Sequence, residues 1–203
     1  MPPALKLYID YASQPSRAIL AFCLLNKIEH TVVETRIAKM EHKSPEFLKI
    51  NPEGQVPAID DGGFCLAESH AILRYLCQTR AVSAQWYPSD AKQRAKVDQY
   101  LDWHHTHLRK CASLVFKTCF APSLLNQKFT REELAEEEKQ VKRALWTMEK
   151  TLQGQKYLCS NEMSIADLSA SHELDMLKFL RYDLSKWPNV EQWLHRCIDE
   201  NAV

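Results

Sequence analysis

The chain has 203 residues, of which 45% are hydrophobic and 26% are charged, and its 26 basic and 26 acidic side chains give a formal net charge of zero. These proportions are typical of a soluble globular protein with a sizeable buried core, and they exclude collagen-like, disordered and membrane-spanning classes. Zero net charge also argues against a general nucleic-acid binder and against binding to an anionic membrane surface.

The seven cysteines are scattered and form neither a CxxC pair nor a Cys/His spacing typical of a zinc site. The first residues, MPPALKLYIDYASQ, lack the basic region and the apolar core of a signal peptide. We therefore expect reduced thiols in a cytoplasmic protein. His104 and His107 lie three residues apart without an HExxH pattern, so polar helix histidines are expected and no metal site is predicted.

The first 80 residues contain all the predicted strands. Apolar and polar residues alternate over 5–9, and 30–36 is rich in β-branched residues, as expected of two strands. Between them, the stretch SRAILAFCLLNKI predicts a helix, with Pro15 placed near its start. A short, irregular helix is predicted to begin near Ser44.

The strands that follow form a predicted hairpin. Asp60-Asp61-Gly62-Gly63 is a strong turn signal between two apolar runs, and apolar residues at helical spacing follow Ser69. The predicted order is β-α-β-α-β-β-α, interpreted as two parallel crossovers followed by an antiparallel hairpin. We assign residues 1–80 to this α/β domain.

Only helical patterns follow a predicted linker at 81–90. We therefore assign residues 91–203 to an all-helical domain. Helices are predicted over 91–120, over 130–153, after the capping box that begins at Ser164, and from Trp187 to about Glu200.

Three short motifs in the first domain have two interpretations each: they bind a ligand, or they have only a structural role. Ser13 in YASQPSR stands between a strand and a helix, where a hydroxyl is usually a cap but can also donate to an anion. Gln55-Val56-Pro57-Ala58 is either an ordinary edge-strand proline or an edge strand that offers backbone groups to a peptide-like ligand. Glu68-Ser69 is either an N-cap or a carboxylate site at a helix N-terminus. Together the three would converge at strand ends of one sheet and suit a short, anionic, peptide-like ligand.

The sequence resembles a cytosolic glutathione transferase, most closely one of the theta class. The resemblance rests on SQPSRA, EHKSPEFLKINPEGQVPAI and LAESHAILRYL, and then on WYPSD, RAKVDQYLDWHHTHLR and SIADL, in this order over essentially the whole chain. It implies a thioredoxin-like glutathione-binding domain, a helical domain that carries the electrophile site, and a homodimer. The implied reaction joins glutathione, a co-substrate rather than a bound cofactor, to electrophilic and mostly apolar small molecules, with some glutathione peroxidase activity.

The resemblance implies that Ser13 is the catalytic residue, whose hydroxyl hydrogen-bonds the glutathione sulfur and stabilises the thiolate. It implies a glutathione-binding set formed by the Val56 backbone, by Glu68 and Ser69 at the γ-glutamyl end, and by His42, Lys43 and Gln55 near the glycyl carboxylate. Tyr11 and Arg109 are assigned to the electrophile site. Tyr11 stands where theta enzymes have an aliphatic residue and about where tyrosine-type enzymes keep their sulfur-contacting hydroxyl, so it could share or replace the role of Ser13.

Two other functions are weighed against this one. A chain of this type can be a non-catalytic scaffold in a protein complex, although a scaffold needs no carboxylate site beside a hydroxyl. A cysteine-type glutathione-dependent reductase would need a cysteine at the position of Ser13, whereas Cys23 lies two to three turns into the helix. The chain also ends soon after its last predicted helix, where theta enzymes usually add another helix, so a more open electrophile pocket is expected.

Overall fold

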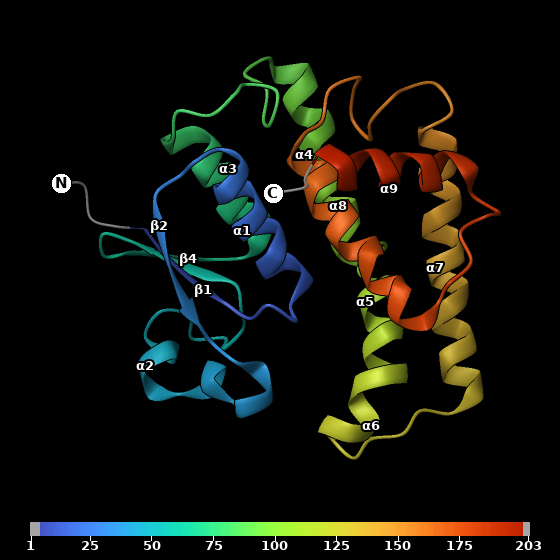
Figure 1. Ribbon diagram of the computed structural model, residues 1–203, viewed down its shortest axis with the longest axis horizontal. Helices are drawn as coiled ribbons and strands as arrows, with labels where there is room; N and C mark the ends of the chain where they lie inside the picture. Colours follow the sequence, from blue (N-terminus) through green and yellow to red (C-terminus); the bar gives the residue numbers. More distant parts are fainter. Residues whose placement is uncertain (1–4, 201–203) are drawn as a thin grey trace. The chain divides into compact units, whose positions relative to one another are not determined.

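The computed structural model describes residues 5–200, and these form two compact units with the division after Ser83 (Figure 1). The N-terminal unit contains a four-stranded sheet with strand order β2-β1-β3-β4. Its elements are β1 (Leu5–Ile9), α1 (Gln14–Leu25), β2 (His30–Glu34), the 3-10 turns η1 (Ile37–Lys39) and η2 (Glu41–Lys43), α2 (Pro45–Leu48), β3 (Ala58–Asp61), β4 (Phe64–Ala67) and α3 (Ser69–Thr79).

The two faces of this sheet are covered by different helices. Side chains alternate along β1, so Leu5, Leu7 and Ile9 share one face and are buried. Helices α1 and α3 pack against each other and against the sheet (Figure 1), and their apolar stripes supply the rest of this core. Tyr8 points to the opposite face, where its ring meets Phe47 of α2 edge-on with 5.9 Å between centroids.

The predicted α/β class is confirmed, but the second predicted parallel crossover is wrong. Strand β2 runs parallel to β1, whereas β3 runs antiparallel to β1 and β4 runs antiparallel to β3. A parallel return needs a helix long enough to carry the chain back along the sheet. The helical pieces between β2 and β3 are only three or four residues each, so the chain stays at the end where β2 finishes.

The predicted hairpin is confirmed. Strands β3 and β4 pair from Ala58 opposite Ala67 to Asp61 opposite Phe64. The turn residues Gly62 and Gly63 have positive φ, a conformation that side chains with a Cβ adopt rarely.

The C-terminal unit is helical throughout its described part. Its elements are α4 (Ala91–Thr106), α5 (Lys110–Val115), the π-helical segment η3 (Phe116–Phe120), α6 (Ala121–Leu124), α7 (Arg131–Thr151), α8 (Ile165–Asp175), the 3-10 segment η4 (Met176–Leu180) and α9 (Pro188–Glu200). Nearly every residue of helix α8 is buried, so this helix lies at the centre of the C-terminal unit. No helix in the described residues is long and apolar enough to cross a membrane.

The single helix predicted over 91–120 is instead broken between α4 and α5. The chain turns at residues 107–109, and Glu173 of α8 accepts a hydrogen bond from the backbone N–H of Ala112 in the first turn of α5, at 3.1 Å. A distant carboxylate therefore satisfies an N–H that a continuous helix would have bonded internally. Local sequence contains no sign of such a partner.

The predicted capping box at Ser164 is confirmed. The Ser164 hydroxyl accepts from the N–H of Ala166, and Asp167 accepts from the backbone N–H of Ser164 at 3.0 Å. Asp167 also accepts from Leu158 N at 2.8 Å and from Trp193 Nε1 at 2.9 Å. This buried carboxylate therefore joins the start of α8 to two other segments.

Candidate active site

The register of the sheet brings four connecting segments to one of its ends. Ile9 at the end of β1 lies opposite Glu34 at the end of β2, while Tyr8 lies opposite Ala58 at the start of β3. Ala58 in turn lies opposite Ala67, the last residue of β4. The segments that carry Ser13, His42–Lys43, Gln55–Val56 and Glu68–Ser69 therefore all join the sheet at this end, as the sequence predicted for three of them.

Ser13 caps helix α1. Its backbone is extended, and its buried hydroxyl oxygen accepts from Ser16 N at 3.4 Å. A hydroxyl oxygen that caps a helix accepts through a lone pair, so the hydroxyl can still donate its hydrogen. Among the described residues no acceptor takes that hydrogen. The cap and ligand interpretations of Ser13 are therefore compatible.

Two residues that the sequence analysis missed hold the Ser13 loop in place. Asp10 accepts from Ala12 N at 2.8 Å and from Ile37 N at 2.7 Å, so it ties the loop to η1. Arg17 donates to the carbonyl oxygens of Tyr11 and Ala12 at 3.0 and 3.1 Å. An aspartate directly after a strand and before a turn is a signal that could have identified Asp10.

The Val56 backbone stands in the approach to β3, followed by a cis peptide bond to Pro57. Neither its N–H nor its carbonyl makes a hydrogen bond within the described part of the chain. The carbonyl of the neighbouring Gln55 is bound by buried Asn51 Nδ2 at 2.8 Å, a positioning contact that the sequence analysis also missed. The expectation of an edge strand is wrong, because β3 lies between β1 and β4.

Helix α3 begins with an unusual backbone conformation. Glu68, not Ser69, occupies the N-cap position, and its φ of 68° and ψ of 109° lie where a residue with a Cβ is strained. Such strain is concentrated at ligand clamps and active sites. Ser69 is buried at the first helical position, and the first intrahelical bond runs from Ile72 N to Glu68 O at 2.9 Å. The N-terminal amides of α3 form a helix end of the kind that can bind an anion.

His42 and Lys43 in η2 are fixed beside the 53–54 turn. Lys43 Nζ donates to the carbonyl of Glu53 at 3.1 Å, which leaves two of its three hydrogens for other acceptors. Gly54 has φ +60°, and a Cβ there would lie 2.7 Å from Lys43 Nζ. Burial, together with the nearby Lys43 charge, lowers the pKa of His42, so its imidazole is neutral at pH 7. The His42 Nδ1 atom is buried and has no hydrogen-bond partner among the described residues.

The two residues predicted for the electrophile lie in different units. The Tyr11 side chain is 52% exposed in the loop before Ser13. Arg109 stands at the turn before α5, where its Nη1 lies 2.8 Å from Oε2 of the buried Glu173. Arg109 is therefore tied to the core of the helical unit and is not an ordinary surface arginine.

The cysteine-type alternative finds no support in Cys23. This thiol is fully buried in α1, and burial raises its pKa to about 12. A thiol with so high a pKa is almost entirely protonated at neutral pH and is a poor nucleophile.

The expectation of polar helix histidines fails for His104, which is completely buried with Nε2 3.4 Å from Glu173 Oε2. His107 instead stacks on Trp103. In the described residues no group of three or more histidine, cysteine, aspartate or glutamate side chains could hold a metal ion.

Comparison with known proteins identifies the family. The model of the glutathione S-transferase N-terminal domain matches residues 4–78, and that of the C-terminal domain matches residues 111–201. Glutathione S-transferase T1 of Arabidopsis thaliana is 45% identical over 203 aligned positions, which cover 94% of this chain and 81% of the relative. The chain belongs to the glutathione S-transferase family.

Solved structures place this glutathione transferase in the theta class. Human glutathione transferase theta-2, in complex with glutathione and an unknown ligand, superposes with a TM-score of 0.93 at 32% identity over 98% of this chain and 82% of that one. A human theta-class enzyme in complex with the glutathione conjugate of 1-menaphthyl sulfate has a TM-score of 0.91 at 34% identity, over 95% and 80% of the two chains. The expected enzyme class is confirmed.

Proposed function

We propose that this theta-class enzyme uses Ser13 to hold glutathione as a thiolate and joins that thiolate to electrophilic, mostly apolar small molecules. The observation that carries the proposal is the state of the Ser13 hydroxyl. It is buried at the N-terminus of α1, accepts one hydrogen bond as a cap, and keeps its own hydrogen for a further acceptor.

The physical effect of such a hydroxyl is on the pKa of the glutathione thiol. An ordinary thiol has a pKa of about 8.5, so only a few per cent of it is ionised at pH 7. A hydrogen bond donated to the thiolate, with the positive end of the α1 dipole nearby, stabilises the charged form. A shift of two pKa units corresponds to about 2.7 kcal/mol and leaves most of the thiol ionised.

Three other segments at this sheet end support the binding of the rest of the tripeptide. The unpaired N–H and carbonyl of Val56 suit the backbone of the cysteinyl residue of glutathione. The two could pair as neighbouring β-strands do. Ser69 and the N-terminal amides of α3 suit the γ-glutamyl carboxylate, and the Glu68 carboxylate suits its ammonium. We assign the glycyl carboxylate of glutathione to His42, Lys43 and Gln55.

The class of electrophile is proposed from the human relative. That enzyme is in complex with the glutathione conjugate of 1-menaphthyl sulfate. A conjugate of such an arylmethyl sulfate forms when a thiolate displaces sulfate from the benzylic-type carbon. The same reaction needs no covalent enzyme intermediate, because the carbon–sulfur bond forms as the carbon–oxygen bond breaks and sulfate leaves with the electron pair. The assignment of Tyr11 and Arg109 to the electrophile stays a prediction.

The test measures the thiolate absorbance of bound glutathione near 240 nm against pH in wild type, Ser13→Ala and Tyr11→Phe. Wild type is expected to show a depressed thiol pKa, which returns toward about 8.5 in Ser13→Ala only. Turnover of 1-menaphthyl sulfate by wild type and both variants then links the pKa to conjugation.

Two results would overturn the proposal. If Tyr11→Phe alone restores the ordinary thiol pKa, the enzyme is a conjugating one but Ser13 is not its activator. If wild type binds no glutathione, a non-catalytic scaffold function explains the protein better than glutathione conjugation does.

Three further expectations stay predictions. The same thiolate can attack a hydroperoxide oxygen, which breaks the O–O bond, releases the alcohol after protonation and leaves glutathione sulfenic acid. A second glutathione then converts the sulfenic acid to the disulfide and water, so an assay with cumene hydroperoxide tests peroxidase activity. Light scattering tests the homodimer, for which twice the 23.5 kDa chain mass is expected. Cell fractionation tests the cytoplasmic location.

A further inference from the structure

Asp10 stands between two segments that the proposed function assigns to different parts of glutathione. Its carboxylate uses both oxygens, since Oδ1 accepts from Ala12 N at 2.8 Å and Oδ2 accepts from Ile37 N at 2.7 Å. The backbone carbonyl of Asp10 accepts from Ser13 N at 3.0 Å. One residue therefore holds the loop that carries Ser13 and also reaches across to the start of η1.

The segment that begins at Ile37 is held together by its own hydrogen bonds. Glu41 accepts from the backbone N–H of Arg36 at 2.7 Å and from its guanidinium at 2.6 Å. Met40 N donates to Ile37 O, and Lys43 N donates to Met40 O, both at 2.9 Å. A change in the position of Ile37 is therefore passed along a continuous series of contacts to η2.

The Asp10 carboxylate also lies within electrostatic reach of His42. Burial and the Lys43 charge lower the pKa of His42, while the negative charge of Asp10 opposes them. Asp10 is thus a negative group beside a site proposed to hold an anionic thiolate, and its charge alone would disfavour that thiolate. The hydrogen bonds of Asp10 and its charge are expected to act in opposite directions, so an experiment can separate them.

We propose that Asp10 is a positioning residue that couples the segment of His42 and Lys43 to the loop of Ser13. Glutathione held at its glycyl carboxylate then meets a Ser13 hydroxyl that is directed at its sulfur. In this role Asp10 touches neither glutathione nor the reacting atoms. The inference rests on the proposed function of Ser13.

Asp10→Asn tests the proposal. Asparagine has one acceptor oxygen, so it can keep only one of the two backbone N–H groups, and the other then faces its NH₂ group. The thiol pKa of bound glutathione, measured by thiolate absorbance near 240 nm, should rise by about one unit. The thiolate fraction at pH 6.5 then falls about fivefold, and KM for glutathione rises. Loss of the charge alone would lower the thiol pKa instead.

Ile37→Pro removes the same contact from its other end. Proline has no N–H and fits the first position of a helical turn, and Arg36, with φ −73° and ψ 116°, has the extended backbone favoured before proline. This variant keeps the Asp10 charge and the Ala12 contact, so it should raise the thiol pKa as Asp10→Asn does. The double variant should raise it by less than the sum of the two single effects.

Asp183→Asn is the matched control. Asp183 accepts from Ser185 N at 2.9 Å, two residues ahead, just as Asp10 accepts from Ala12 N. Asp183 lies in the helical unit, outside the segments assigned to glutathione. The substitution is chemically the same, and the thiol pKa should stay at its wild-type value.

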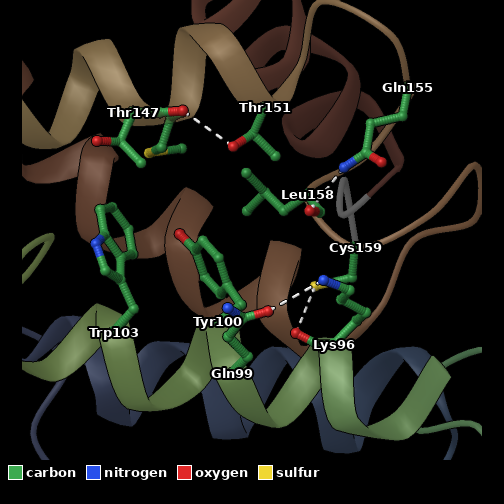
Figure 2. A pocket seen from close by; sticks show the side chains of 10 residues that line it. Lys96, Gln99, Tyr100, Trp103, Thr147, Thr151, Gln155, Leu158 and Cys159 are labelled. Atoms are coloured by element: carbon green, nitrogen blue, oxygen red, sulfur yellow. Dashed lines mark hydrogen bonds between the residues drawn. The ribbon is translucent and has the colours of Figure 1, made fainter. Parts of the chain in front are cut away.

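A second control loosens a segment of the helical unit. Gln155 Nε2 donates to Leu158 O at 2.8 Å, and this contact holds the 155–159 segment beside a cavity between α4 and α7 (Figure 2). Gln155→Leu should lower the thermal transition without a change in the thiol pKa. It therefore shows whether a general loss of stability can shift the thiol pKa.

The inference is overturned if Ile37→Pro leaves the thiol pKa at its wild-type value, if Asp10→Asn leaves it unchanged or lowers it, or if either control raises it equally. If one of the two test variants fails to fold, the other decides. Ser13→Ala separates this outcome from a failure of the proposed function. If Ser13→Ala raises the thiol pKa and the Asp10 and Ile37 variants do not, only the role of Asp10 is lost. If Ser13→Ala has no effect either, both proposals are wrong.

Discussion

The guanidinium of Arg109 and the carboxylate of Glu173 form an ion pair at 2.8 Å, with the carboxylate almost fully buried and the arginine side chain 28% exposed. The same carboxylate accepts from Ala112 N at the start of α5 and lies 3.4 Å from His104 Nε2. Glu173 therefore fixes both the direction of Arg109 and the place where the helix restarts after its break.

Neutralising Glu173 should destabilise the helical unit. Glu173→Gln keeps the shape but removes the charge that supports three contacts, so the free energy of unfolding should fall by about 2–3 kcal/mol in chemical denaturation. Glu138→Gln is the control, since the Glu138–Lys142 ion pair at 2.6 Å is exposed and should contribute less than about 0.5 kcal/mol. Equal effects of the two changes would contradict a buried role for Glu173. If Arg109 meets the electrophile, Glu173→Gln should also raise KM for the electrophile and leave KM for glutathione unchanged.

Ser13→Gly separates the catalytic role of the hydroxyl from its capping role. Glycine at an N-cap costs only a few tenths of a kcal/mol relative to serine, so stability should be nearly preserved. Conjugation at pH 6.5 should nevertheless fall about 100-fold, because the thiol loses the donor that stabilises its ionised form. The difference from wild type should shrink as pH rises toward 9, where glutathione ionises unaided. A difference that is constant with pH would count against thiolate stabilisation.

Gly54→Ala should weaken glutathione binding through Lys43. The added Cβ would lie 2.7 Å from Lys43 Nζ and 2.9 Å from His42 O, at a residue with φ +60°. The change should lower stability by at least about 1 kcal/mol and raise KM for glutathione. Gly63→Ala is the control, because Gly63 has φ +95° but no atom within 4 Å of the added Cβ. Gly63→Ala should lower the free energy of unfolding without changing KM for glutathione. If KM for glutathione is unchanged in Gly54→Ala, Lys43 does not bind glutathione.

Stability should fall as the solution becomes mildly acidic, in part through His104. Burial lowers the pKa of His104 in the folded chain, whereas an unfolded histidine titrates near 6.5. The unfolded state therefore takes up the proton first, and stability present above pH 6.5 is lost as pH falls toward the folded value. The loss through one such group is at most about 1.4 kcal/mol per pH unit.

Denaturation of wild type and His104→Gln between pH 7.5 and 5.5 measures this effect. The variant should show a shallower dependence on pH, and the exposed His195→Gln should behave like wild type. Parallel curves for all three proteins would show that His104 does not titrate in this range.

The local features of the fold were predictable because short-range chemistry determines them. The alternation in β1, the double-glycine hairpin turn and the Ser164 capping box each depend on residues a few positions apart. The position of Ser13 as the N-cap of α1 was predictable for the same reason, since its motif contains both the strand end and the helix start.

Features that depend on distant partners were not predictable from one sequence. The break between α4 and α5 requires Glu173, more than 60 residues away. The contacts of Asp10 with Ile37 also join segments far apart in sequence, and the direction of β3 depends on how the 35–57 connection packs. In each case the residue type fits several local structures, and tertiary contacts select one.

The hairpin turn at Gly62–Gly63 lies at the end of the sheet opposite to the one that carries Ser13, Val56 and Ser69. The sheet thus carries the proposed glutathione-binding segments at one end and an exposed two-glycine turn at the other. A fluorophore, an affinity tag or a surface linker attached at this turn would sit a full strand length from the proposed binding segments. We therefore expect labelling or immobilisation there to leave the proposed thiolate chemistry unchanged.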